Sequence, residues 1–310
     1  MMKVAICICT YRRPKGLARL LQGLSRLCFR KVSAPAVELV IVDNTAEGMM
    51  RDFCEKAQRD YRWPIRYEIE PCRGISYARN RAIQSVREGT DFVAFIDDDE
   101  VPEPSWLDEL LYVQGAYHAD VVGGPTLGIF EKPVASWLIG AKFFGTDRYP
   151  TGKFLKEAYA GNVLIRRDIL SRLRVSFDSE YALTGREDLM FFSNIYALGG
   201  KLIWADDAVV CEYVPESRTN IKWILRRAYS LGNGRMRVEM RKADSSLKKT
   251  IFFAQAVWRA LRNSITLLFV AVRGEKLAVI VCLREVFKAF GRMTAIWGVS
   301  FKEYQATYGE

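Results

Sequence analysis

Apolar and polar residues follow two different periods along the first 115 residues of this 310-residue chain. Short apolar runs have the length of buried strands, and the segment after each carries apolar residues at helical spacing. The runs cover 3–9, 37–42, 65–69 and 92–96, and the helical segments cover 14–27, 49–60, 75–86 and 105–114. Four strand-helix alternations in this order predict a doubly wound α/β sheet, in which ligands bind beyond the carboxyl ends of the strands.

The next hundred residues have a less regular pattern. Residues 125–160 mix prolines and glycines with aromatic residues, a composition typical of a long functional loop. After this loop, the pattern predicts strands over 161–165, 201–204 and 208–213 and a helix over 185–200. We therefore predict that residues 1–215 form one catalytic or binding domain.

The last third of the chain is basic and richly apolar. From residue 216 onward there are 18 lysines and arginines against 7 acidic residues, so the net charge of +10 lies in this part. Residues 217–242 have the pattern of a basic helix, and the apolar runs within 248–300 are interrupted by arginines before they reach the roughly 18 to 20 residues that cross a bilayer. The region 216–310 is therefore predicted to form amphipathic helices in a membrane interface. Packing onto the domain core or in a homodimer interface is the alternative.

Cysteine usage and charge placement narrow the class of protein. The seven cysteines form no CxxC pair, which fits a reducing cytosol, and the first apolar run is typical of a strand rather than a secretory signal. A pI near 9.2 raises the possibility of nucleic-acid binding. The basic residues lie beside long apolar runs rather than in a polar patch, which disfavours it.

Four consecutive acids, Asp97-Asp98-Asp99-Glu100, directly follow the apolar run 92–96. Carboxylates gathered at the end of a buried strand repel one another unless a cation or solvent relieves the repulsion. Two other predicted strands also end in polar clusters, Thr10-Tyr11-Arg12 and Asp43-Asn44. A solvated acidic loop is the simpler interpretation of the four acids, but their position at a strand end favours a site for a hard divalent metal.

With these segments in order, the chain resembles glycosyltransferase family 2, over nearly its whole length to about residue 235. Among its members it is most similar to bacterial exopolysaccharide enzymes such as the succinoglycan-type glucosyltransferases. The resemblance implies the GT-A fold with its mixed sheet. It rests on Cys9-Thr10-Tyr11-Arg12-Arg13-Pro14, Ile41-Val42-Asp43-Asn44, Ile75-Ser76-Tyr77-Ala78-Arg79-Asn80, Phe95-Ile96-Asp97-Asp98-Asp99-Glu100, Gly185-Arg186-Glu187-Asp188 and Val214-Pro215-Glu216-Ser217-Arg218.

The resemblance assigns the acidic run to the DxD motif, which binds Mg²⁺ or Mn²⁺ on the diphosphate of a nucleotide sugar. It implies that Asp99 is a direct metal ligand, that Asp97 is a ligand or lies nearer the ribose, and that Asp98 is the spacer. Glu100 would not bind the metal directly but would support the residues that do, or lead the chain toward the next helix. Several family members have a histidine at the position of Cys211, so either water completes the metal shell here or the neighbouring Glu212 substitutes.

Further residues are implied to bind the nucleotide sugar. Asp43 matches an acid that accepts a hydrogen bond from uracil, and an Asx turn with Asn44 is its alternative. The other implied contacts are Thr10, Tyr11 and Arg12 at the base, Arg79 reaching toward the nucleotide, and Arg226 and Arg227 at the diphosphate. The alternative for Arg79 is an exposed arginine on a helix, and the alternative for Arg226 and Arg227 is a solvated or membrane-facing basic helix.

Glu187-Asp188 matches the family's ED motif, in which the aspartate is the general base. Asp188 would take the proton from the acceptor hydroxyl, and Glu187 would orient the acceptor or its surroundings. A single base opposite the leaving group implies inversion at the anomeric carbon. Acids at a helix N-terminus also have an ordinary role, since they complement the helix dipole.

The resemblance as a whole implies a metal-dependent enzyme that moves a hexose, with UDP-glucose as the expected donor, onto a polyprenyl-diphosphate-linked oligosaccharide. Its expected place is the cytoplasmic face of the bacterial inner membrane, in exopolysaccharide or cell-surface polysaccharide synthesis. A non-catalytic protein that kept the fold and binds nucleotide sugars or membranes is the alternative. The presence of Asp97, Asp99 and Asp188 argues against it.

Overall fold

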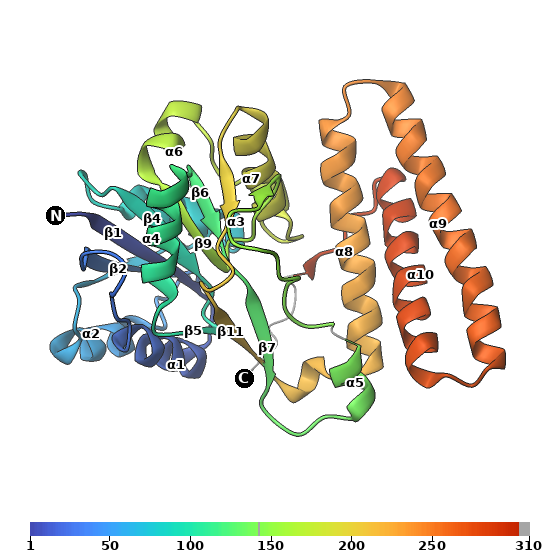
Figure 1. Cartoon of the computed structure of the whole chain (residues 1–310), viewed down its shortest axis with the longest axis horizontal. Coiled ribbons are helices and arrows are strands. Elements are labelled where there is room, and N and C mark those ends of the chain that lie inside the picture. Colours follow the sequence, from blue (N-terminus) through green and yellow to red (C-terminus); the bar gives the residue numbers. More distant parts are fainter. Residues whose placement is uncertain (142, 304–310) are drawn as a thin grey trace.

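The computed structural model describes residues 1–141 and 143–303 and consists of an α/β domain with three long helices at one side (Figure 1). Its larger sheet, within the described residues, has eight strands in the order β3-β2-β1-β4-β9-β6-β10-β8. The strands are β1 (Lys3–Thr10), β2 (Ala36–Asp43), β3 (Ile65–Ile69), β4 (Phe92–Ile96), β6 (Val121–Gly123), β8 (Phe154–Leu155), β9 (Asn162–Arg166) and β10 (Leu202–Trp204). The first four are parallel, and β9 runs antiparallel to both β4 and β6, so the sheet is mixed.

Six helices cover the two faces of this sheet in the part of the chain that the structure describes. On β1, Val4, Ile6 and Ile8 pack against helices on one face, and the alternate residues Ala5, Cys7 and Cys9 pack against helices on the other. The first set of helices is α1 (Pro14–Ser25), α2 (Arg51–Asp60) and α4 (Trp106–Tyr117), and the second is α3 (Ile75–Ser85), α6 (Arg167–Leu173) and α7 (Glu187–Ala197). Both faces are buried, as the unbroken apolar strands predict, and the predicted α/β class is confirmed.

A second, smaller sheet begins directly after the acidic run. Its order is β5-β11-β7, with β5 (Glu100–Pro102), β11 (Val210–Val214) and β7 (Thr126–Phe130). β5, β6 and the seven-residue α6 were not predicted, because elements this short show little of a period. The three-residue β10 does fall within the predicted strand 201–204. The segment 125–160 is less irregular than its composition suggests, since it holds β7, β8 and the short helix α5 (Ser136–Gly140).

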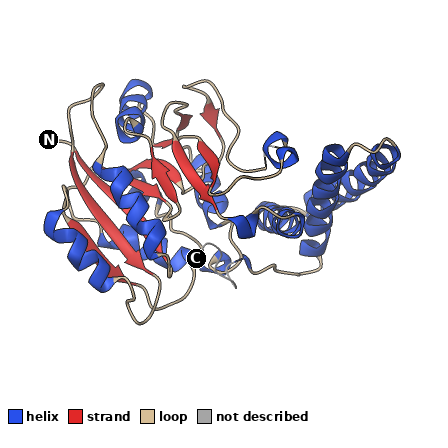
Figure 2. Cartoon of the chain, turned by 90° about the horizontal axis from the view of Figure 1, so that it is seen from below, coloured by secondary structure: helices blue, strands red, loops and turns tan. Residues whose placement is uncertain are grey.

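Three helices follow the short 3₁₀ helix η2 (Glu216–Arg218). They are α8 (Ile221–Lys242), α9 (Ser246–Val272) and α10 (Lys276–Ile296), and in Figure 2 they lie to one side of the strands. α8 lies beside the α/β domain, α10 packs on α8, and α9 packs mainly on α10 (Figure 1). Within the described residues, no helix combines the length and apolarity that a membrane span requires.

Three basic side chains in the second half of α8 face the α/β domain, where they meet acidic and hydroxyl partners. Arg235 pairs with Glu157 at 2.7 Å and Arg241 with Asp178 at 3.1 Å. Arg237 also donates to the Thr184 hydroxyl at 2.6 Å. This part of the cationic excess therefore holds α8 on the domain, instead of forming the solvated or membrane-facing helix that the sequence left open.

α8 and α10 approach closely at Gly232, because a Cβ atom there would lie 1.9 Å from the Lys288 carbonyl oxygen. We predict that Gly232→Ala lowers the free energy of unfolding by about 1–3 kcal/mol, as overpacking does. Gly115→Ala is the matched control, because this glycine is also in a helix but is exposed and its Cβ would meet nothing within 4 Å. The control should stabilise the protein by roughly 0.5–1 kcal/mol. Equal shifts of the urea midpoint in both variants would contradict the close packing.

Candidate active site

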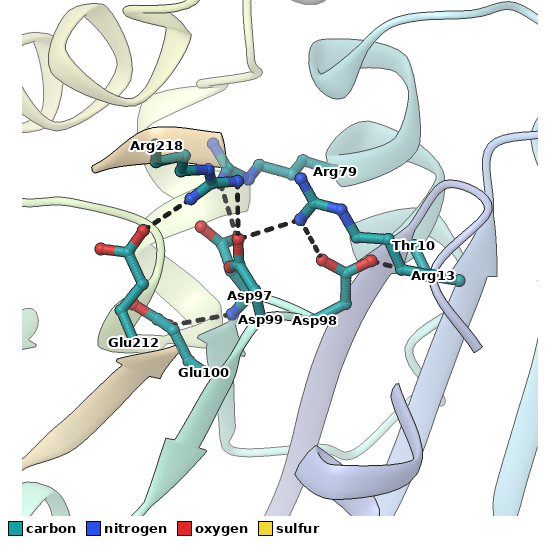
Figure 3. A network of polar contacts seen from close by, with 9 residues as sticks. All are labelled: Thr10, Arg13, Arg79, Asp97, Asp98, Asp99, Glu100, Glu212 and Arg218. Atoms are coloured by element: carbon teal, nitrogen blue, oxygen red, sulfur yellow. Dashed lines mark hydrogen bonds and ion pairs between the residues drawn. The ribbon is translucent and has the colours of Figure 1, made fainter. Parts of the chain in front are cut away.

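The acidic run turns from the larger sheet into the smaller one, between the end of β4 and the start of β5 (Figure 3). The Glu100 backbone N–H donates to the Asp97 carbonyl oxygen at 3.1 Å, which closes the turn. Arginines from three other segments, Arg13, Arg79 and Arg218, reach these carboxylates. The run is therefore a junction of the two sheets rather than a solvated loop.

Asp98 is buried and tied to the first strand. It accepts hydrogen bonds from the Thr10 hydroxyl and from Arg13 Nη1, both at 2.8 Å. Burial raises the pKa of Asp98 to about 6, although Arg13 opposes the shift. The Thr10 side chain therefore fixes the acidic run in this structure, whereas the sequence analysis placed it at the base.

Asp99 is paired with two arginines. Arg13 Nη1 lies 3.0 Å from Asp99 Oδ2 and Arg218 Nη2 lies 3.2 Å from the same oxygen. Burial alone would raise the pKa of Asp99, but the two guanidinium groups outweigh it and lower the pKa below its usual range. Arg218 Nη1 also pairs with Glu212 at 2.8 Å. Sequence reasoning gave Arg13 and Arg218 no role, although both lie within the quoted motifs.

Arg79 joins the acidic run to the ED motif. It is 4% exposed, and its Nη2 donates to Asp97 Oδ1 at 3.0 Å while its Nη1 donates to Glu187 Oε1. Burial raises the pKa of Glu187 to about 7 despite Arg79. Glu187 Oε2 is buried with no hydrogen-bond partner in the part of the chain that is described. The buried Arg79 guanidinium thus links Asp97, a predicted metal ligand, to Glu187 of the predicted catalytic pair.

Asp188 lies beside this pair in the first turn of α7. Its side chain is half-buried, and Oδ1 accepts from the Leu189 backbone N–H at 2.6 Å. The Asp188 charge contributes to the raised pKa of Asp97 and of Glu187, so the three carboxylates act on one another. The structure therefore brings the DxD-like acids and the ED-like acids to one site.

The Glu100 side chain holds the turn of the acidic run in place. Its carboxylate accepts from the Asp97 backbone N–H at 3.1 Å and from the Thr126 hydroxyl at 3.2 Å. A Cβ atom at Gly161 would lie 2.8 Å from Glu100 Oε1, so only a glycine leaves room for this carboxylate. This placement agrees with a supporting role.

Asp43, at the end of β2, is held by donors from its own loop and from β3. It is fully buried, and its Oδ1 accepts from the Thr45 backbone N–H at 3.0 Å and the Thr45 hydroxyl at 2.8 Å. Its Oδ2 accepts from the Met50 backbone N–H and the Tyr67 hydroxyl, both at 2.8 Å. A carboxylate has about four acceptor directions, and these four donors fill them. In this structure Asp43 forms an Asx turn that fixes the loop, and its contact with uracil stays a prediction.

Two pairs of residues that were predicted to bind the nucleotide sugar, Tyr11 with Arg12 and Arg226 with Arg227, contact other parts of the protein. Arg12 and Arg73 stack over the Tyr11 ring, with guanidinium carbons 5.3 and 5.0 Å from its centroid. Arg227 pairs with Glu303 at 2.8 Å, and Arg226 lies over the Phe301 ring. The latter two therefore contact the segment after α10 in this structure, and the Arg227 charge also lowers the pKa of Glu212.

The residues around the acidic run fit a divalent cation. Burial raises the pKa of Glu100 and of Glu212, and the nearby Asp99 charge raises both further, so negative charge remains uncompensated there. Carboxylate oxygens are the ligands that Mg²⁺ and Mn²⁺ prefer. Glu212 faces Arg218, whereas the Cys211 sulfur lies 4.0 Å from Glu103. In the described ranges no three His, Cys, Asp or Glu side chains form a complete cage, so an ion would need further ligands from outside the protein.

The fold and this site define an α/β protein with a cluster of acids at the ends of its strands, and comparison with known proteins identifies its family. The model of "Glycosyl transferase family 2" matches residues 5–174, and the chain belongs to this family of glycosyltransferases. The succinoglycan biosynthesis protein ExoM of Rhizobium meliloti is 30% identical over 240 residues, which cover 77% of this chain and 76% of that protein. The glucosyl-dolichyl phosphate glucuronosyltransferase of Haloferax volcanii is 25% identical, over 81% of this chain and 82% of that protein.

Solved structures show the same fold. The mannosyltransferase PcManGT of Pyrobaculum calidifontis, in complex with GDP-Man and Mn²⁺, has a TM-score of 0.65 at 16% identity, over 95% of this chain and 87% of that chain. TarS residues 1–349 of S. aureus, in complex with UDP-GlcNAc, has a TM-score of 0.55 at 16% identity, over 96% and 91%. The predicted GT-A fold with its mixed sheet is confirmed.

Proposed function

We propose that this glycosyltransferase is metal-dependent and inverting, and that it transfers a hexose, with UDP-glucose as the expected donor, onto a polyprenyl-diphosphate-linked oligosaccharide. The observation that carries the proposal is the bridge from Asp97 through Arg79 to Glu187. It supports a site in which a donor bound near Asp97 would meet an acceptor near Glu187 and Asp188. The names of the relatives from R. meliloti and H. volcanii support polysaccharide synthesis and a lipid-linked substrate. The expected location is the cytoplasmic face of the inner membrane.

Asp99 and Asp97 would hold the cation, and either water or Glu212 would take the place of the family's histidine. When bound, Mg²⁺ or Mn²⁺ neutralises the charge that builds up on the departing nucleoside diphosphate. Arg13 and Arg218 keep the carboxylate of Asp99 ionised, because their charges lower its pKa. An ionised carboxylate is the form that binds a metal.

Asp188 would act on the acceptor side. Its carboxylate takes the proton of the acceptor hydroxyl while the new glycosidic bond forms, and no covalent glycosyl-enzyme is needed. Arg79 holds Glu187 and thereby fixes the first turn of α7, which carries Asp188. Inversion follows, because the acceptor attacks from the side opposite the leaving diphosphate.

A donor screen tests this function. The full chain is incubated with UDP-glucose, UDP-GlcNAc or GDP-mannose and with Mn²⁺ or Mg²⁺, and release of the nucleoside diphosphate is measured. We expect turnover of UDP-glucose that excess chelator abolishes and added Mn²⁺ restores. Full activity in excess chelator would refute the metal role of Asp97 and Asp99. Thermal stabilisation by a donor without any turnover would favour the non-catalytic alternative.

A further inference from the structure

α9 has two apolar faces, and only one of them is covered. Ala256 is buried on the side that packs on α10. The opposite side carries large apolar residues that are 43–90% exposed. We call these residues the α9 stripe: Leu247, Ile251, Trp258, Leu261, Ile265, Leu268, Phe269 and Val272.

The members of the α9 stripe fall on one side of the helix, because they follow one another at intervals of mostly three, four or seven residues. A helix of 27 residues is about 40 Å long, so the stripe is long as well as apolar. α9 is the outermost of the three helices (Figure 1). A contiguous exposed apolar surface of this size marks a site of interaction with another molecule or with a membrane.

A row of cations borders the stripe. Lys248, Arg259, Arg262 and Arg273 are exposed, and they succeed one another at intervals of 11, 3 and 11 residues. Eleven residues make close to three helical turns, so the four side chains line up along one border. Within the described residues, Lys248 pairs with the exposed Asp244, and no ion pair joins the three arginines to an acid. Arg262 lies over the Trp258 ring at 4.8 Å.

α9 itself contains no aspartate or glutamate. A second copy of the chain that docked through the same stripe would bring two rows of like charge together with no acid on either helix to pair them. An anionic bilayer provides both a layer for the apolar residues and negative headgroups for the cations. Tryptophan, which the stripe contains at Trp258, is enriched at the level of the headgroups.

We propose that the α9 stripe lies in the plane of an anionic membrane surface, with its cationic border at the headgroups. α8 faces the catalytic domain through Arg235, Arg237 and Arg241, so α9 supplies the membrane contact that the sequence analysis ascribed to the whole basic region. The surface would bring the active site to the membrane-bound acceptor of the proposed function. Membrane binding is measured without any sugar transfer, so the two proposals can fail separately.

Vesicle flotation of the full chain tests the proposal. Wild type is mixed with phosphatidylcholine vesicles that contain or lack phosphatidylglycerol, and we expect binding to the anionic vesicles. Leu261→Glu with Leu268→Glu should reduce this binding at least tenfold, because both changes place charge in the apolar layer. Arg259→Gln with Arg262→Gln should reduce it roughly 25-fold on anionic vesicles, about fivefold for each cation removed.

The matched control is Tyr112→Glu with Tyr196→Glu, which makes the same charge change at exposed apolar residues of α4 and α7. This variant should bind as wild type does, and equal thermal midpoints in all variants would show that folding is intact. Wild-type binding by the α9-stripe variant would overturn the proposal. A second result would also overturn it: wild type does not bind vesicles but forms a dimer in size-exclusion chromatography, and the α9-stripe variant dissociates that dimer. The α9 stripe would then contact a second copy of the chain rather than a membrane.

Discussion

Asp188→Asn is expected to abolish sugar transfer while leaving donor binding intact. The carboxylate lies in the first turn of α7, beside Glu187 and within the electrostatic reach of Asp97. Asparagine keeps the shape of the side chain but cannot take a proton from the acceptor hydroxyl. Loss of a general base lowers the rate by about 10²–10⁴-fold. The measurement is kcat for transfer to a lipid-linked acceptor, with the donor Kd measured in parallel by titration.

Asp168→Asn is the control for the helix-dipole explanation. Asp168 also lies in the first turn of a helix, α6, but it is exposed and pairs with Arg166. An acid at a helix N-terminus contributes roughly 0.3–1 kcal/mol to stability, so both variants should lose a similar small amount. Only Asp188→Asn should lose activity. If Asp188→Asn remains active, Asp188 is not the base, and a comparable loss of kcat in both variants would reduce its role to helix stability.

The strand-helix order of the first 115 residues could be predicted because each buried strand is a continuous apolar run. β3 and β4 have the predicted bounds, and both faces of the larger sheet are covered by helices. The smaller sheet could not be predicted in this way, because β5 and β11 pair across more than 100 residues of sequence. Its strands are short, and their pairing is fixed by tertiary contacts rather than by a local period.

The candidate site was predictable where motif residues meet one another. Asp97 and Glu187 come from two separate motifs and lie in one site, but the sequence did not show that Arg79 joins them. Asp43 illustrates the opposite case, since a polar residue after a strand can equally satisfy its own turn. The basic residues of α8 were ambiguous for a similar reason: their partners Glu157 and Asp178 lie more than 60 residues away in the sequence. Charge counts alone could not reveal those pairs.

Arg79→Met is expected to cause the largest loss of stability among the substitutions considered. The guanidinium is 4% exposed and pairs with Asp97 and Glu187, so methionine would leave two carboxylates without their cation. Removing one partner of a buried ion pair costs about 3–5 kcal/mol. Arg81→Met is the matched control on the same helix, because its pair with Glu68 is partly exposed and contributes about 0.2–1 kcal/mol. Urea unfolding of both variants measures the difference, and equal losses would contradict the bridge.

The loss caused by Arg79→Met should also depend on pH. In the folded wild type the pKa of Glu187 is raised by burial to about 7, and Arg79 opposes this shift, so the pKa is higher still in the variant. A carboxyl group with a raised folded-state pKa is least unfavourable to folding at low pH, where it is protonated in both states. As pH rises above the unfolded-state pKa, only the unfolded state releases the proton, so stability falls until the folded-state pKa is reached. That limit is about 7 in the wild type and higher in the variant, so the variant goes on losing stability where the wild type no longer does. We therefore expect the difference in unfolding free energy between wild type and Arg79→Met to be small near pH 5 and to grow toward pH 8. A constant difference over this range would show that Glu187 does not need the Arg79 charge.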